Sequence, residues 1–533
     1  MKKVSKYILL IIVFLPLLYF RDFTPNNELK YLSIADEALR SGTYLTFTHE
    51  GSIYTDKPPL YLWLIMLCKQ LLGHHSMLLL GLFSFIPALL ILYVMEKWLS
   101  PYILPNYLFT FSLMLITTGL FAGSAIVLRM DMLMSLFILL ALYTFYRMYT
   151  GQAGKGAKVL LPLYIFLALF TKGPLGLIIP FFSILAFLLY QKEGKTFFSY
   201  FGFLQWFILV GLCSVWFLGV YWEGGSDYLY NLVFHQTLDR AMDSFHHKEP
   251  FYYYFTTIWY ALAPWSLLYI FVPAIALWKR QLKSNIEKFF LTILVANFLL
   301  LSLFSSKLDI YLLPIFPFFA GLTILLLERF FERTVSFTIA VPALLFALSL
   351  PASYFFITQT EWHYPVSLQI AIFLLSAAAL LSLHYLYRKK ILYAIRSLAG
   401  GIILVIFIGG FYIPHLNPYI GFREICREAA QIAAQQNIDH YYYYNFRSGE
   451  NMDVYLKTEV KEIRIYEIPE IAQRENFILF LRNKDIRRNP ALSPLLPQDH
   501  SIDCGNYRIV LFRKLQQENL PAENNPIKSL SFR

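Results

Sequence analysis

Long apolar stretches dominate the first 413 residues and are separated by short polar segments. Runs of about 17 to 25 apolar residues are long enough to cross the ~30 Å hydrocarbon core of a bilayer as helices. After Pro414 the long apolar runs stop and charged residues return. The pattern predicts a polytopic α-helical membrane protein followed by a small domain outside the membrane.

Composition agrees with this pattern. The chain is 57% hydrophobic and 15% charged, whereas soluble domains carry about 25% charged residues. The net charge of +11 does not indicate a nucleic-acid partner, because basic residues of membrane proteins collect in short cytoplasmic loops. The apolar spans exclude a soluble enzyme that uses a nucleotide sugar.

Basic loops set the predicted orientation. Residues 279–288, 329–333 and 388–396 are assigned to the cytoplasm, and the basic amino terminus predicts an uncleaved first span. We expect 13 spans, at residues 1–20, 78–97, 104–121, 129–148, 158–171, 174–190, 203–222, 253–277, 288–305, 309–328, 334–357, 367–387 and 394–413.

This assignment places residues 21–76 and 223–252 in loops outside the cytoplasm. Residues 58–73 then start and end on the same side, so we expect an interfacial helix that begins at Pro58 and Pro59. The predicted domains are a membrane domain over 1–413, an extracytoplasmic α/β domain over 414–516 and a disordered tail over 517–533.

Ionisable residues gather on the predicted outer side of the membrane. Any one of them could be an interfacial anchor, but their shared sidedness favours a common cavity. Several cations at a boundary between water and lipid suit a phosphate attached to a lipid tail, since lysine and arginine both bind phosphate. The candidate phosphate-binding residues are Lys57, Arg129, Lys172, Arg240 and Lys307.

The order of motifs resembles the GT-C membrane glycosyltransferases, in particular the aminoarabinose lipid A transferases and the protein O-mannosyltransferases. The matching stretches are PNNELKYLSIADEALRSGTYL (25–45), YTDKPPLYLW (54–63), RMDMLMSLF (129–137), TKGPLGL (171–177), HHKEPFYYY (246–254) with PW (264–265), and SKLDIYLLPIFP (306–317).

The resemblance implies an enzyme of the bacterial inner membrane whose active site faces the periplasm. It would transfer a sugar, with inversion, from a polyprenyl-phosphate carrier to lipid A or another acceptor, without a nucleotide sugar. Lys57 matches the lysine that contacts the carrier phosphate, and Asp131 matches an acidic residue near the active site. Asp56 and His247 match a pair that binds zinc in the aminoarabinose transferases, and aspartate is an acceptable zinc ligand.

The sequence departs from the family at the expected base. The first loop of the family carries an Asp-Glu pair, and here the residues are Asn27 and Glu28. Because asparagine cannot accept a proton, Glu28, Asp22 or Asp131 would have to replace the base. Alternatively, an ionised phosphate on the acceptor needs no base, or catalysis is weak. The catalytic candidates are therefore Asn27, Glu28 and Asp131.

Residues 421–437 have helical apolar spacing, and four later stretches read as strands: DHYYYYNF, KEIRIYEI, NFILFLRN and YRIVLFRKL. Tyr441 to Tyr444 alternate between the two faces of a strand, so core packing is favoured over sugar stacking. Cys426 and Cys504 lie in this extracytoplasmic part and would pair only if their geometry allows it.

Other function classes remain open at this stage. A transporter of lipid-linked sugars would also need outer charges, although it normally has broken, repeat-related helices with polar residues at mid-membrane. A noncatalytic partner is compatible with Asn27. Within the enzyme class, the acceptor is a glycolipid such as lipid A, a polysaccharide or a protein hydroxyl.

Overall fold

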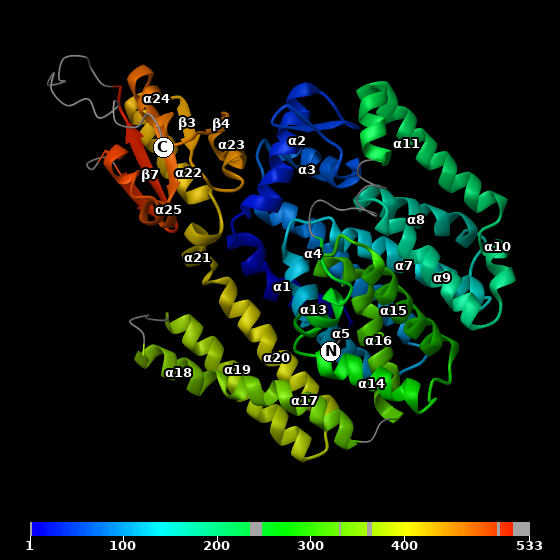
Figure 1. Ribbon diagram of the computed structural model, residues 1–533. Coiled ribbons are helices and arrows are strands. Elements are labelled where there is room, and N and C mark those ends of the chain that lie inside the picture. Colours follow the sequence, from blue (N-terminus) through cyan, green and yellow to red (C-terminus); the bar gives the residue numbers. More distant parts are fainter. Residues whose placement is uncertain (1–2, 235–247, 330–331, 360–364, 498–500, 515–533) are drawn as a thin grey trace, which may run out of the picture. The chain divides into compact units, whose positions relative to one another are not determined.

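The computed structural model describes residues 3–234, 248–329, 332–359, 365–497 and 501–514. The described residues form two compact units (Figure 1). The first consists of Met1–Arg21 with Ile34–Pro414, and the second of Asp22–Ser33 with His415–Arg533, each as far as it is described. The second unit is therefore built from two distant parts of the chain.

The first unit is almost entirely helical, with one short hairpin. Its helices are α1 (Lys3–Phe20), α2 (Lys30–Ser41, which begins in the second unit), α3 (Pro59–Leu72), α4 (Met77–Leu99), α5 (Pro105–Ile116), α6 (Gly119–Ile126), α7 (Asp131–Tyr149), α8 (Ala157–Lys172), α9 (Leu175–Tyr190), α10 (Phe197–Tyr200), α11 (Phe203–Tyr230), α13 (Tyr253–Ala261), α14 (Ser266–Trp278), α15 (Asn285–Leu303), α16 (Phe316–Leu326), α17 (Glu332–Ala347), α18 (Ser349–Gln359), α19 (Val366–Tyr387) and α20 (Ile391–Gly410). Strands β1 (Phe47–His49) and β2 (Ser52–Tyr54) pair antiparallel, and the 3-10 segment η4 (Asp309–Ile315) precedes α16.

Each of the 13 predicted spans falls on an apolar helix or a bent helix pair. Among the described residues, eight helices are long and apolar enough to cross a bilayer, or up to eleven spans if three pairs bent by 79°, 69° and 119° each count as one. The two other predicted spans fall on α8 and α9, which have 16 residues each. The predicted class, a polytopic helical membrane protein, is confirmed.

An ion pair connects two of the three basic loops that the sequence predicts to be cytoplasmic. Arg329 forms a bidentate pair with Glu287 at 2.7 and 3.0 Å, which joins two of the basic loops. Glu287 also closes a capping box with Ser284 at the start of α15. The Lys6 ammonium is buried against Glu96 near the end of α4. The Arg329–Glu287 pair agrees with placing residues 279–288 and 329–333 on one side of the membrane.

The predicted interfacial segment 58–73 forms helix α3, Pro59–Leu72. Proline at its first turn costs no hydrogen bond, and Gly73 ends the helix in the left-handed region with φ 73°. Asp36 of α2 holds this region together, since it contacts Lys69 of α3 at 2.5 Å and His75 at 2.7 Å.

The second unit contains a five-stranded mixed sheet in the order β4-β3-β5-β7-β6. β3, β4 and β5 are parallel, and β7 is antiparallel to both β5 and β6. Its elements are α21 (Ile413–Ile420, whose first residues belong to the first unit), α22 (Arg423–Gln436), β3 (His440–Tyr443), α23 (Asp453–Leu456), β4 (Val460–Glu462), α24 (Ile468–Arg474), β5 (Phe477–Arg482), α25 (Asn483–Arg488), β6 (Ser501–Cys504) and β7 (Tyr507–Phe512).

Most elements predicted for the tail are confirmed, namely helix 421–437 and three of the four strands. The strand expected at KEIRIYEI is shorter, Val460–Glu462, because Pro469 starts helix α24 soon afterwards. Tyr441 and Tyr443 are buried on one face of the sheet and Tyr441 stacks on Phe480, so core packing is confirmed for these tyrosines. The structure shows Cys426 and Cys504 as free, buried thiols.

Candidate active site

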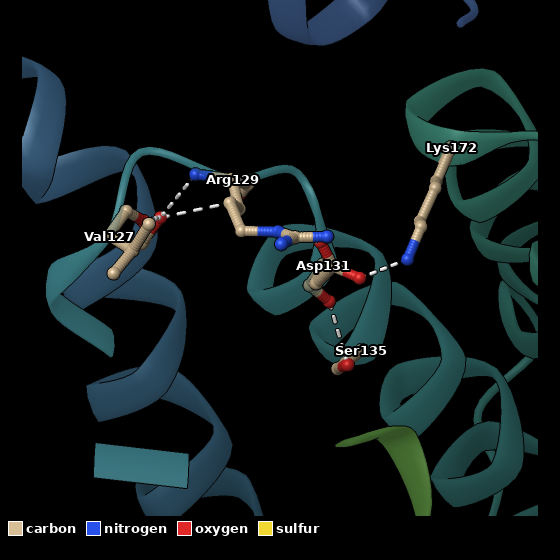
Figure 2. A network of polar contacts seen from close by, with 6 residues as sticks. Val127, Arg129, Asp131, Ser135 and Lys172 are labelled. Atoms are coloured by element: carbon tan, nitrogen blue, oxygen red, sulfur yellow. Dashed lines mark hydrogen bonds and ion pairs between the residues drawn. The ribbon is translucent and has the colours of Figure 1, made fainter. Parts of the chain in front are cut away.

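A buried ionic cluster lies at the amino-terminal end of α7 (Figure 2). Asp131 is 1% exposed, and its Oδ2 accepts a hydrogen bond from Arg129 Nε at 3.1 Å. Its Oδ1 pairs with the Lys172 ammonium, which comes from the end of α8. The sequence predicted all three residues separately, and the structure brings them together.

The backbone around this cluster is fixed by two serines. Ser84 of α4 donates to the carbonyls of Val127 at 2.6 Å and Arg129 at 3.1 Å, and Ser135 donates to the carbonyl of Asp131 at 2.7 Å. Because one carboxylate oxygen of Asp131 contacts Arg129 and the other contacts Lys172, the carboxylate is held in one orientation. This arrangement suits Asp131 to positioning the two cations beside it.

Two glycines explain how the TKGPLG turn places Lys172. Gly173 has φ 102° and ψ −152°, a conformation that residues with a Cβ rarely adopt. At Gly176 an added Cβ would lie 2.2 Å from the carbonyl carbon of Ala168, so α8 and α9 approach too closely for any side chain there. The Lys172 side chain is therefore delivered by a tight hinge between two helices.

The SKLDIY segment contacts the same cluster. The Lys172 ammonium lies 4.7 Å from the centroid of the Tyr311 ring, a distance typical of cation–π contacts. Tyr311 belongs to η4, whose first residue, Asp309, accepts hydrogen bonds from Tyr253 at 3.1 Å and Tyr260 at 2.7 Å. Segments far apart in sequence thus meet at Lys172.

Lys307 lies two residues before η4 and is 3% exposed. Its ammonium donates to the carbonyl of Glu249 at 2.7 Å, and burial lowers the pKa of Lys307 despite the nearby Glu249 charge. In the described residues Lys307 therefore fixes the loop that follows residue 247, and its contact with a phosphate stays a prediction.

Asp56 and Lys57 follow strand β2 and precede α3, and both side chains are half-buried. Two residues that the sequence analysis did not single out hold this hairpin. The Glu223 carboxylate of α11 accepts from the backbone N–H groups of Tyr44, Leu45 and Thr46, at 3.0, 2.8 and 2.7 Å.

The second residue is Tyr228, whose hydroxyl accepts from Phe47 N at 3.0 Å and donates to the Tyr54 carbonyl at 2.7 Å. Next to Glu223, an added Cβ at Gly224 would lie 2.5 Å from Thr46 Cγ2. The sequence signal was the Glu-Gly-Gly triplet (223–225) directly after an apolar span, which combines a carboxylate with two small residues. These contacts position the hairpin that leads to Lys57.

The other predicted catalytic residues belong to the second unit. Glu28 is fully buried, and its carboxylate accepts from the backbone N–H of Thr24 at 2.7 Å and from its hydroxyl at 2.9 Å. Asn27 is exposed. Asp22, a candidate replacement for the base, accepts from Arg423 N at 2.9 Å and from the Tyr455 hydroxyl at 2.5 Å. Asp22 thus ties its segment to α22 and α23.

Arg240 and His247 lie outside the described residues. Within the described ranges, no three His, Cys, Asp or Glu side chains are grouped as a metal site would require. Of the two predicted zinc ligands, only Asp56 belongs to the described residues, so the zinc site at Asp56 and His247 stays a prediction.

No family model matches the sequence. An uncharacterized protein of Aquifex aeolicus is 25% identical over 82% of this chain and 84% of its own length. Undecaprenyl phosphate-alpha-4-amino-4-deoxy-L-arabinose arabinosyl transferases of Edwardsiella ictaluri and Wigglesworthia glossinidia brevipalpis are 27% and 25% identical over 59% and 58% of this chain. The alignments span 58% and 57% of the length of these two transferases, less than two thirds.

A solved structure, ArnT from Cupriavidus metallidurans bound to undecaprenyl phosphate, superposes with a TM-score of 0.77 at 16% identity, covering 96% of this chain and 99% of that one. The apo form of the same protein gives a TM-score of 0.74. Together the sequence and structure comparisons confirm the resemblance to the GT-C membrane glycosyltransferases, and this chain has their fold.

Proposed function

We propose that this protein is a glycosyltransferase that moves a sugar from a polyprenyl-phosphate carrier to a lipid A acceptor. The observation that carries the proposal is the Arg129–Asp131–Lys172 cluster, which holds two cations around one carboxylate on a fold shared with ArnT. The arabinosyl transferases that match in sequence are named for a carrier of this kind.

In the proposed reaction, the acceptor oxygen attacks the anomeric carbon while the bond from that carbon to the carrier phosphate breaks. The leaving group is polyprenyl phosphate, and the anomeric configuration inverts. Lys57, Arg129 and Lys172 would stabilise the charge that develops on this phosphate, which is usually a large catalytic contribution. Asp131 would act as a positioning residue because it already contacts both Arg129 and Lys172.

The acceptor proton needs no protein base if the acceptor is itself an ionised phosphate. Two observations favour this form of the proposal: Asn27 cannot accept a proton, and the Glu28 carboxylate is fully buried and held by Thr24. Phosphate groups of lipid A meet this requirement, which a neutral protein hydroxyl would not.

We further propose that the protein lies in the bacterial inner membrane with Lys57 and the ionic cluster facing the periplasm. The basic loops joined by the Glu287–Arg329 pair would then be cytoplasmic, as the positive-inside rule expects. The new thiol of Lys155→Cys, in the exposed α7–α8 turn, should react only with thiol reagents that cross the inner membrane.

The test is to delete the gene, compare lipid A by mass spectrometry and complement with wild-type protein, Lys57→Ala or Lys155→Ala. Lys155 is an exposed lysine of the α7–α8 turn and serves as the matched control. We expect deletion to remove one sugar mass, and wild type and Lys155→Ala to restore it. Lys57→Ala should lower turnover about a hundredfold.

An unchanged lipid A spectrum after deletion would overturn the acceptor assignment and direct the search to glycoproteins and polysaccharides. Full activity of Lys57→Ala would overturn the role of Lys57 while leaving the class of reaction intact.

A further inference from the structure

A groove runs between α1, α19 and α20 of the first unit and has a volume of about 690 Å³. Its lining is apolar except at one end, where Arg396 and Ser397 lie. Small residues, Ala377, Ala378, Gly400 and Gly401, form part of its wall. The proposed reaction uses none of these residues.

The two glycines of this wall have different surroundings. A Cβ on Gly401 would lie 2.6 Å from the Cβ of Ala378, so Gly401 allows α19 and α20 to pack closely. A Cβ on Gly400 would meet no atom within 4 Å. Gly400 therefore keeps the groove open without contributing to helix packing.

The groove has one charged end. The Arg396 guanidinium donates to the Thr110 hydroxyl at 2.9 Å and to the Asn106 carbonyl at 2.6 Å, which holds it at this position. The turn just before α20 adds Arg388, Lys389 and Lys390. A phosphate at this end would meet several positive charges, and arginine binds phosphate well.

The length of the groove fits one lipid leaflet. From Arg396 to Phe407 the lining follows about three turns of α20, roughly 16 Å along the helix axis. Half of a ~30 Å hydrocarbon core is about 15 Å. An acyl chain could thus lie in the groove with its phosphate at Arg396.

This end of the first unit is far from the ionic cluster. Arg396 contacts Asn106, shortly after α4 ends at Leu99, whereas Ser84 of α4 contacts the backbone of Arg129. About four turns of α4, roughly 22 Å, separate Ser84 from Leu99. A lipid whose phosphate lies at Arg396 is therefore distinct from a carrier whose phosphate lies at Lys172.

We propose that this groove binds an anionic phospholipid. One acyl chain lies between α1, α19 and α20, and the headgroup phosphate faces Arg396 and the basic turn. In the orientation proposed above, this lipid belongs to the cytoplasmic leaflet, where anionic lipids attract basic segments next to membrane helices.

The test uses the full-length protein, delipidated in detergent, with phosphatidylglycerol and phosphatidylcholine of identical chains as probes. Bound lipid is counted by native mass spectrometry, and the thermal midpoint is measured with each lipid. Gly400→Leu fills the groove. Gly409→Leu is the matched control, since Gly409 is another α20 glycine with open space around it that does not line the groove.

We expect phosphatidylglycerol to raise the midpoint of wild type and Gly409→Leu by several degrees, and to raise that of Gly400→Leu by less than half as much. Neutralising the turn with Lys389→Gln and Lys390→Gln should weaken the preference for phosphatidylglycerol about tenfold. If Gly400→Leu fails to fold, Ala377→Leu, at an exposed position of the same wall, takes its place.

The proposal would be overturned if phosphatidylglycerol raised the thermal midpoint equally in wild type, Gly400→Leu and Gly409→Leu. It would also be overturned if the two lipids raised the wild-type midpoint equally. A wild-type dimer that becomes a monomer in Gly400→Leu would show that a second copy occupies the groove, and would overturn it too. Sugar transfer in the Gly400→Leu protein reports on the proposed function separately, because this variant leaves the ionic cluster untouched.

Discussion

At the residue scale, Asp131 shows how a carboxylate can serve a site for anions. It contacts Arg129 and Lys172 together, and its other interactions are with its own helix and turn. Without Asp131 the two cations would repel each other and lose their common partner. The sequence placed all three residues on one side of the membrane, but their contact depends on the hinge after α8.

Asp131→Asn should therefore lower carrier binding and turnover, although it removes no side chain that contacts the phosphate. We expect turnover to fall between about tenfold and a hundredfold and KM for the carrier to rise, because Lys172 and Arg129 lose their orientation. The measurement is steady-state kinetics in proteoliposomes. Asp227→Asn, at an exposed carboxylate of α11, is the control; equal kinetics in both variants would contradict the positioning role.

Asp22 carries a second prediction at this scale. Its carboxylate is 1% exposed and accepts hydrogen bonds from Phe23 N, Arg423 N and the Tyr455 hydroxyl. In asparagine an NH₂ group replaces one carboxylate oxygen, and this hydrogen-bond donor would face other donors. Asp22→Asn should therefore lower the free energy of unfolding of the second unit by about 2 to 4 kcal/mol. Pulse proteolysis in detergent measures this loss, and Asp439→Asn, at an exposed position, should show almost none.

At the scale of elements, the α8–α9 hinge depends on glycine residues, which have no side chain beyond Cα. Gly176→Ala would force a Cβ to within 2.2 Å of the Ala168 backbone, and backbone atoms cannot move away as a flexible side chain can. We expect the free energy of unfolding to fall by about 1 to 3 kcal/mol. Activity should fall as well, because Lys172 moves with the hinge. Gly123→Ala, where an added Cβ meets no atom within 4 Å, is the control in thermal unfolding.

The contact between α2 and α3 predicts a dependence on pH. Burial alone would raise the pKa of Asp36, but hydrogen bonds and charges from His75 and Lys69 outweigh it and hold this pKa below its ordinary value of 3.8. Because folding lowers its pKa, the ionised Asp36 carboxylate stabilises the fold above pH 3.8. This contribution is lost as the pH falls further and the carboxylate takes up a proton.

We therefore expect the first loop to open to protease in acid below about pH 4. Because Asp36→Asn cannot ionise, this variant should be less stable at neutral pH and should show a smaller change on acidification. Protection of the α2–α3 segment from hydrogen exchange measures both effects. An identical pH profile in wild type and Asp36→Asn would contradict this assignment.

The sequence predicted elements best where one pattern extends over many residues. The long spans and strand β5 are continuous apolar runs, and helix α22 follows the 3.6-residue period of an amphipathic helix. The bends within α5–α6 and α13–α14, by 69° and 119°, carry little periodic signal. The support of the β1–β2 hairpin by Glu223 also escaped prediction, because single side chains binding a distant backbone leave no local pattern.

At the scale of the whole molecule, the fold class followed from composition and span length, and the comparisons confirmed it. The membership of Asp22–Ser33 in the second unit could not be foreseen. It rests on pairs such as Ser33 with Asp453 and Asn26 with Ser448, whose members lie about 420 residues apart. Long-range pairing of this kind is invisible to any local window.

The divided second unit also sets an order of events during synthesis. Residues 22–33 leave the ribosome early, but their partners after His415 follow about 380 residues later. At roughly 5 to 20 residues per second this delay is on the order of a minute. Throughout that time Asp22 and Glu28 lack the surroundings that bury them in the finished protein. A nascent chain that stops anywhere before His415 therefore keeps its first loop unfinished, and the last part to be translated completes one of the first.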